Sequence, residues 1–345
     1  MRTRIVPLVI LAFTAGLMAA DATAQAPPNL PIPPTTPHSR DRSVVRYQGR
    51  GGPEQTERFS RRLKLGRSGW LTLSNIAGTI VVTGGAGDEL TIEAVKRTRG
   101  DQSRLASVRI DVDERSGRVE VRTVPTERNL RVAVDYTVTV PADAGVELRS
   151  MSGDIKVTGV QGAVRAESVS GNVTADRTPR LERAKSVSGD VDLTDVGADS
   201  DVSAGSVSGN LRATGFKGRG LDLNTISGDV VLTNVTCDRV DVRSVSGNIE
   251  FSGTLPKKAR LELGSHSGTV RLALAGDTGF ELSASSVSGS FRSDLPLTIG
   301  ADNTRDDRGR GDSRLGRSIR ATYGDGSASL SVRTFSGDVV INKAK

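Results

Sequence analysis

The sequence predicts an all-β protein, a single-domain parallel β-solenoid with coils of about 19 residues and an N-terminal β cap. Three observations support this prediction. A Ser-Val-Ser-Gly phrase followed by Asp or Asn recurs from residue 150 to the C-terminus. Apolar residues alternate with polar ones on both sides of the phrase, which is typical of strands. No stretch has the pattern of a long helix, so the repeated unit is built from strands and turns.

The glycines of the phrase mark the coils. From Gly153 to Gly289 they lie 18, 18, 20, 19, 19, 21 and 21 residues apart, a period typical of stacked repeats. At such a corner Gly supplies a backbone conformation that residues with a Cβ resist, and the next Asp or Asn can bond nearby backbone groups. We expect ten structural repeat corners, at Gly78, Gly153, Gly171, Gly189, Gly209, Gly228, Gly247, Gly268, Gly289 and Gly337.

Strands are expected on both sides of each corner. Leu221 and Leu223 precede Gly228, and Val230 and Leu232 follow it, so the two alternations are out of phase by one residue. Each coil is therefore expected to hold two short strands and two turns, with polar residues at the outward positions. Stacked coils would pair in parallel at about 4.8 Å per coil. An aromatic content of 3% predicts an interior of Val, Ile and Leu.

The N-terminal region is expected to be a leader and a spacer. Residues 1–24 have a basic start, an apolar run from Ile5 to Ala20 and Ala-x-Ala sites, which predicts a signal peptide cleaved after Ala24. The apolar run is shorter than the 18 or more residues that a membrane span needs. Residues 25–58 are rich in Pro and Gly and predict a disordered spacer. These features predict an exported protein of the periplasm or cell surface, with no membrane span after signal removal.

The remaining chain divides into a cap and the repeats. Residues 59–145 contain alternating runs, with a hairpin turn at Ser116-Gly117, and predict an N-terminal β cap section. Residues 146–345 are expected to form the β-solenoid repeats. A polar loop insertion at 293–320 interrupts the period, and the strands after it are expected to return to the pattern and close the stack.

Charge and cysteine content indicate little specific chemistry. The formal net charge is +7, and removal of Arg2, Arg4 and Asp21 with the leader leaves +6. The single cysteine, Cys237, cannot form an internal disulfide, so ladder hydrogen bonds and the core must hold the fold. One outward column carries opposite charges on successive coils, Arg149, Glu167 and Lys185, and predicts pairing between adjacent coils.

Catalytic and cofactor sites are not indicated. The acids Asp154, Asp190 and Asp229 could form a row like that of polysaccharide-active β-helix enzymes, but Asn172 and Asn210 alternate with them. Asp and Asn are interchangeable in turns and not in acid-base catalysis. The Gly-Gly-x-Gly-x-Asp repeat of calcium-binding rolls does not occur. We therefore expect no enzyme activity, no cofactor, no metal site and, with few scattered aromatic residues, no nucleic-acid binding.

The leader, the β section ending in Val138-Thr139-Val140-Pro141 and the successive Ser-Val-Ser-Gly-Asp coils resemble the bacterial putative-adhesin domain family, a domain of unknown function. The resemblance covers about residues 70–345 and brings no catalytic residues with it. The chain departs from the pattern at His266, where other corners have Val, and in the loop after Gly289. These departures predict less regular stacking at that end.

Two functions remain open from the sequence. One is a non-enzymatic exported cell-envelope binding protein, a putative adhesin that presents a rigid solenoid surface to an envelope polymer or protein. The other is a self-associating structural scaffold, whose coils would join end to end through unpaired edges. The sequence does not indicate the ligand, the oligomeric state, the handedness of the solenoid or whether the loop at 300–318 binds anything.

Overall fold

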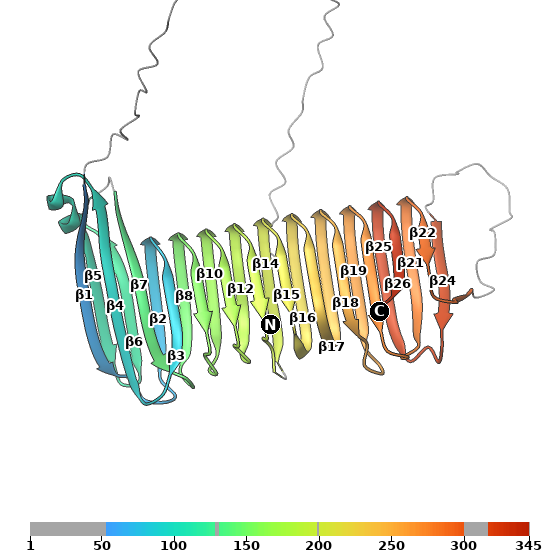
Figure 1. The fold of residues 1–345 in the computed structure, drawn as a ribbon, viewed down its shortest axis with the longest axis horizontal. Coiled ribbons are helices and arrows are strands. Elements are labelled where there is room, and N and C mark those ends of the chain that lie inside the picture. The colour runs from blue at the N-terminus through green and yellow to red at the C-terminus, as the bar shows by residue number, and fades with distance from the viewer. Residues whose placement is uncertain (1–52, 128–130, 199, 300–316, 345) are drawn as a thin grey trace, which may run out of the picture. The chain divides into compact units, whose positions relative to one another are not determined.

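The computed structural model describes residues 53–127, 131–198, 200–299 and 317–344. The predicted signal peptide and most of the predicted spacer lie outside these residues. The described residues form strands almost throughout, with one short 3-10 helix (Figure 1). The predicted all-β solenoid is confirmed, because strands from successive repeats pair side by side in parallel.

One row of parallel strands precedes the glycine corners, and we call these the leading strands. Each pairs with its equivalents in the two neighbouring coils; Val164, for example, lies opposite Val146. In spatial order the row contains β2 (Trp70–Ala77), β8 (Gly145–Ser152), β10 (Val164–Ser170), β12 (Leu181–Ser188), β14 (Asp201–Ser208), β16 (Lys217–Ser227), the second part of β17 (Val230–Ser246), β19 (Arg260–Ser267), β25 (Ala328–Ser336) and β21 (Phe280–Ser288).

A second row follows the corners, and we call these the trailing strands. They are shorter than most leading strands, and they also pair in parallel from coil to coil. In spatial order they are β3 (Ile80–Gly85), β9 (Ile155–Thr158), β11 (Val173–Asp176), β13 (Val191–Thr194), β15 (Leu211–Thr214), the first part of β17, β18 (Ile249–Thr254), β20 (Val270–Ala275), β26 (Val339–Lys343) and β22 (Phe291–Ser293).

The last repeat of the sequence is not the last coil of the stack. β25 lies between β19 and β21, and β26 lies between β20 and β22, so the coil of Gly337 is inserted between those of Gly268 and Gly289. The expectation that the final strands close the stack is therefore wrong. The reason is that β24 (Arg317–Tyr323) pairs antiparallel with the outer edge of β21, which leaves only the inner edge of β21 open to β25.

The N-terminal section extends both rows beyond the Gly78 coil. β6 (Arg118–Pro125) pairs in parallel with β2, and β5 (Val108–Arg115) forms a hairpin with β6. On the other row, β7 (Val132–Pro141) pairs with β3, β4 (Glu89–Arg99) with β7, and β1 (Glu54–Lys64) with β4. The 3-10 helix η1 (Gln102–Ser107) connects β4 to β5. The folded section thus begins at Glu54, inside the segment expected to be spacer.

The loop insertion expected at 293–320 also contains strands at its ends. β23 (Thr298–Ile299) and β24 pair with each other antiparallel. Residues 300–316, which include most of the predicted polar loop, lie outside the described residues.

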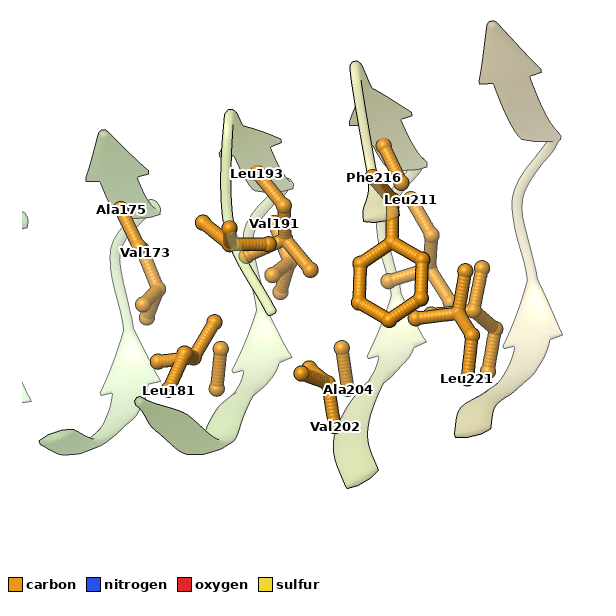
Figure 2. Close-up of a cluster of buried hydrophobic side chains, with 14 of the residues drawn as sticks. Val173, Ala175, Leu181, Val191, Leu193, Val202, Ala204, Leu211, Phe216 and Leu221 are labelled. Carbon is orange, nitrogen blue, oxygen red and sulfur yellow. The ribbon is translucent and has the colours of Figure 1, made fainter. Parts of the chain in front are cut away.

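The core is one continuous layer of side chains between the two rows (Figure 2). Val, Leu, Ile and Ala from both rows fill it, as the alternation predicts. Aromatic residues also enter, contrary to the expectation for the interior, since Phe216, Phe251, Phe280 and Tyr136 are buried. Phe216 fits because Gly197 and Gly218 lie against its ring, where a Cβ would collide with it.

Candidate binding groove along the coil corners

The valine of the corner phrase faces solvent. In the coil of Gly189, Ser186 is buried, Val187 is 44% exposed, and the side chains of Ser188 and Asp190 lie at the surface. The outward alternation of the leading strand continues to Val187, and only the glycine that follows turns the chain. The prediction that outward positions are polar is wrong here. The equivalent positions form what we call the corner ridge, in spatial order Ile76, Met151, Val169, Val187, Val207, Ile226, Val245, His266, Phe335 and Val287.

The glycines lie at the closest approach between coils. A Cβ on Gly189 would collide with the backbone carbonyl of Gly171, and one on Gly209 would collide with that of Gly189. The same holds for all ten predicted corners except that Gly78 meets Val134 in place of a glycine. At Gly189 this contact favours glycine and a left-handed backbone does not, since its φ lies outside the left-handed region. At Gly153, φ is +142°, so conformation contributes there as well.

In most coils the buried serine or threonine of the phrase bonds to the neighbouring corner, whereas the hydroxyls of Ser150 and Ser244 have no hydrogen-bond partner. The Ser186 hydroxyl donates to the Gly171 carbonyl at 2.8 Å, and the Ser206 hydroxyl donates to the Gly189 carbonyl at 2.9 Å. Thr225 makes the corresponding contact with Gly209 at 3.3 Å. A small hydroxyl side chain fits this position because it donates a hydrogen bond to a corner carbonyl in the closely packed region between coils.

The Asp and Asn residues after the glycines form a hydrogen-bonded row. The Asp154 Oδ1 atom accepts from the backbone N–H of Asn172 at 2.8 Å, and the Asn172 Oδ1 atom accepts from the N–H of Asp190 at 2.8 Å. The pattern continues through Asn210 and Asp229. These side chains thus bond backbone groups, as expected, but the groups belong to the neighbouring coil and not to the same turn. Since an acid and a neutral residue alternate in this row, no two carboxylates occupy adjacent coils.

A groove runs beside the corner ridge on the outer face of the leading strands. Its volume is about 730 Å³, and its walls are Met151, Val169, Val187 and Val207 on one side and Arg149, Glu167 and Lys185 on the other. The buried serines form its floor, and Asn75 and Thr123 close one end. A second hollow of about 540 Å³ continues along Val245, His266, Phe335 and Val287. The imidazole of His266 stacks on the Phe335 ring with centroids 4.8 Å apart, so the ridge is continuous across the inserted coil.

The polar wall of the groove belongs to what we call the flank column, two residues before the ridge on each leading strand. It contains Ser74, Arg149, Glu167, Lys185, Gly205, Asn224, Arg243, Gly264, Arg333 and Ser285.

The expected pairing of charges within the flank column is wrong. Arg149 pairs with Glu147 at 2.6 Å, and Arg243 pairs with Asp241 at 2.7 Å, in each case two residues earlier on the same strand. Glu167 pairs with Arg183 of the next coil at 3.3 Å, and Arg183 lies outside the column. Residues two apart on a strand point to the same face, and a long arginine reaches along the strand to a shorter acid.

The cysteine lies in the interior and away from the groove. The Cys237 thiol is buried and donates to the backbone carbonyls of Arg219 at 3.3 Å and Arg239 at 2.9 Å. Burial raises the pKa of this thiol to about 11. A thiol in this environment is inert, which makes Cys237 a core residue.

Neither a metal site nor a helical membrane span is found in the part of the chain that the structure describes. No group of three or more His, Cys, Asp or Glu side chains is placed there to hold a metal ion. The helix η1 has six residues, and no helix within the described ranges has the length and hydropathy of a membrane span.

Comparison with known proteins gives one family and several solved structures. Residues 181–342 match the family model described as Toastrack DUF4097. A putative adhesin from Bacteroides fragilis aligns at 10% identity over 83% of this chain and 97% of its own, with a TM-score of 0.38. A putative lipid binding protein from Parabacteroides distasonis aligns at 10% identity over 84% and 97%, with a TM-score of 0.39. A putative adhesin from Parabacteroides merdae aligns at 8% identity over 84% and 97%, with a TM-score of 0.26. No curated protein gives a significant match.

Proposed function

We propose that this protein, whose residues 181–342 match the Toastrack DUF4097 family model, is an exported, non-enzymatic binding protein of the cell envelope. It would act as an adhesin that holds an envelope polymer or protein against its solenoid. The observation that carries the proposal is the groove of about 730 Å³ beside the corner ridge.

The side chains of this groove favour binding over chemistry. One wall is aliphatic and the other carries charges that are largely paired with neighbours on the same face. The ligand pockets of proteins commonly combine apolar walls with a few polar groups that fix orientation. Catalysis would require acids, bases or nucleophiles that converge on one point, whereas equivalent side chains here repeat once per coil along a line.

The shape of the groove favours an extended ligand. It crosses the coils of Met151, Val169, Val187 and Val207, so a bound molecule would contact the same kind of side chain at intervals of about 4.8 Å. A linear polymer or the edge of another repeat protein can use such a surface over its length. A compact small molecule would contact only a fraction of it.

Export is part of the proposal and rests on the sequence. The basic start, apolar run and Ala-x-Ala sites of residues 1–24 support it. Immunodetection of the native protein in periplasmic, outer-envelope and cytoplasmic fractions tests this part directly. Recovery of the full-length chain with its leader in the cytoplasm alone would contradict it.

The binding role is tested by capture with the mature chain, residues 25–345. Immobilised parent protein is incubated with solubilised envelope from the source organism and compared with a Val187→Lys variant, which places a charge in the apolar wall. Val231→Lys is the matched control, because Val231 points outward from a trailing strand on the other face. We expect Val187→Lys to lose the captured material and Val231→Lys to retain it. Equal capture by all three proteins would reject the groove as the binding site.

A deletion of residues 300–318 separates the groove from the polar loop. We expect this variant to capture the same molecules as the parent. Loss of capture after the deletion, with Val187→Lys unaffected, would assign binding to the loop.

A further inference from the structure

We propose that the partner seated on the corner ridge and its groove is a second copy of this chain, paired side by side in parallel and in register. The inference rests on the proposed function, because it names the occupant of the same groove. Two observations carry it: a continuous apolar ridge, and flanks of opposite charge on its two sides.

The apolar ridge is too long to be a set of isolated exposed residues. Met151 is 61% exposed, Ile226 and Val245 are 50% exposed, and the ridge continues across ten coils, with His266 as its one non-apolar member and Ile76 partly buried. Nine steps between coils correspond to about 43 Å. Contiguous exposed apolar surface of this extent is typical of an interaction site.

The charges beside the ridge select the kind of partner. On the flank column, Arg149, Lys185, Arg243 and Arg333 are positive. On the opposite side of the ridge, the residue five positions later is Asp154, Asp190 and Asp338 in three of these coils and the neutral Asn248 in the coil of Arg243. A uniformly anionic surface, such as an acidic bilayer, would be repelled by the aspartates, and a cationic one by the flank column. The matching partner carries the same two charges in reversed positions.

A second copy supplies this arrangement through a two-fold axis along the ridge. Rotation about that axis exchanges the two flanks and leaves the coil order unchanged, so each coil faces its own equivalent. Lys185 then faces Asp190 of the second copy, and Arg149 and Arg333 face Asp154 and Asp338 of the second copy. Identical aliphatic side chains meet along the ridge, and the corner of each copy enters the groove of the other.

The register is fixed by Glu167, the acid of the flank column. In register, Glu167 faces the neutral Asn172 of the second copy. A shift by one coil in either direction would place Glu167 opposite Asp154 or Asp190 of the second copy. Like charges in those positions repel, whereas the in-register arrangement gives three opposite pairs and no like pair.

The area is sufficient for a reversible dimer. From the flank column to the corner acid is five residues, at most about 16 Å because the chain turns at the glycine, so the strip covers at most about 700 Å² on each copy. Stable interfaces bury about 800 Å² per partner, and smaller ones are typical of transient association. We therefore expect a dimer whose population depends on concentration.

Sedimentation equilibrium on the mature chain over a hundredfold range of concentration tests the pairing. The average mass should rise toward twice that of the monomer. A Val187→Ser/Val207→Ser variant should remain monomeric over the same range, since both side chains are exposed and their loss leaves the core intact. The control Val231→Ser should dimerise as the parent does. A parent that is monomeric at every concentration, or a ridge variant that dimerises like the parent, would overturn the proposal.

Cysteine cross-linking tests the orientation. Met151→Cys and Phe335→Cys are each second from one end of the ridge, and each should form a disulfide with the same residue of a second copy. When the two variants are mixed, cross-links between position 151 and position 335 should not form. Their formation would show antiparallel pairing and contradict the proposed register.

The outcomes for self-pairing and for envelope binding are distinguishable. A monomeric parent that captures envelope material through the ridge overturns self-pairing alone. A dimer that dissociates in the ridge variant supports self-pairing even if the capture experiment identifies no other molecule.

Discussion

Gly189 illustrates why glycine occupies the corner of each coil. The carbonyl of Gly171 from the neighbouring coil lies where a Cβ would be, while the φ of Gly189 is not left-handed. Gly159 presents the reverse case, with φ of +69° and nothing within 4 Å of a built Cβ. The two glycines therefore separate the effect of contact between coils from that of backbone conformation.

We expect Gly189→Ala to lower the free energy of unfolding more than Gly159→Ala. A methyl group against backbone atoms forces two coils apart and costs about 1–3 kcal/mol or more. Alanine in a left-handed conformation costs about 1 kcal/mol. Urea denaturation followed by circular dichroism measures both variants. A Gly189→Ala protein that unfolds at the midpoint of the parent would show that the coils are not in close contact at this corner.

The alternation of Asp and Asn in the corner row makes a second prediction at this scale. Asn210→Asp would place a carboxylate between Asp190 and Asp229, each one coil away, and should destabilise the fold by about 0.5–1 kcal/mol at pH 7. The loss should shrink in 1 M salt, which screens the repulsion between the carboxylates. Asp190→Asn keeps the accepting oxygen and should be nearly silent. Equal unfolding free energies for both variants at pH 7 would contradict a role for charge spacing.

Cys237 provides a prediction on pH. Its folded-state pKa of about 11 lies above the ordinary thiol value, so the folded chain holds the proton more tightly than the unfolded chain. The stability from this group is complete below about pH 9 and is lost as pH rises toward 11. Between pH 8 and 10 the parent should lose about 1 kcal/mol more than a Cys237→Ala variant. Parallel pH profiles for the two proteins would show that the thiol is not buried.

At the scale of elements, the order of strands near the C-terminus departs from the order of the sequence. Ser267 of β19 lies opposite Ser336 of β25, and Ser336 lies opposite Ser288 of β21. The inserted coil keeps the ridge continuous, because Phe335 takes the place between His266 and Val287.

Disulfide formation tests the inserted coil. Adjacent parallel strands bring equivalent Cα atoms to about 5 Å, a distance that a disulfide can bridge, whereas strands separated by a coil lie beyond about 7 Å. A Ser267→Cys/Ser336→Cys variant should therefore oxidise to an intramolecular disulfide, and Ser267→Cys/Ser288→Cys should not. A disulfide in the second variant alone would show that the coils stack in the order of the sequence, with no inserted coil.

Most of the coil could be predicted from the sequence, because its signals are local. The glycine period and the alternation around Gly228 fix two strands and a corner, and both are found. The exposure of Val187 could not be predicted, since its parity fits either strand and only the three-dimensional corner decides which face it joins. The insertion of β25 between β19 and β21 could not be predicted from the sequence either. All leading strands carry the same pattern, and pairing between them depends on which strand edges remain open.

The second turn of each coil follows the trailing strand, and the alternation of apolar and polar residues does not predict its position. Gly159, Arg177, Asp195, Gly215 and Asn234 all have φ between +50° and +71° at equivalent places in successive coils. Gly and Asn tolerate this conformation, and Asp does so to a lesser extent. A column of such residues at the coil period would have located the turn.

At the scale of the folded unit, the two ends of the stack differ from its sides. β1 covers the edge of β4 and presents Arg58, Arg61 and Arg62, and β24 covers the outer edge of β21. Charged side chains on an edge strand oppose the addition of further strands. End-to-end scaffold assembly is therefore less favoured than contact along the corner ridge.

The central claim is that the corner ridge is the surface through which this protein binds. It is tested most directly by Val187→Cys, a substitution close to valine in size and polarity, with Thr194→Cys of the trailing strand as the control, in a chain whose native Cys237 is buried and unreactive. The rate of alkylation by iodoacetamide is measured on a trace amount of each variant alone and after addition of excess parent protein or solubilised envelope. We predict that either addition slows alkylation at position 187 and leaves the rate at position 194 unchanged. Equal rates with and without the additions at position 187, or slowing at position 194 alone, would contradict the account.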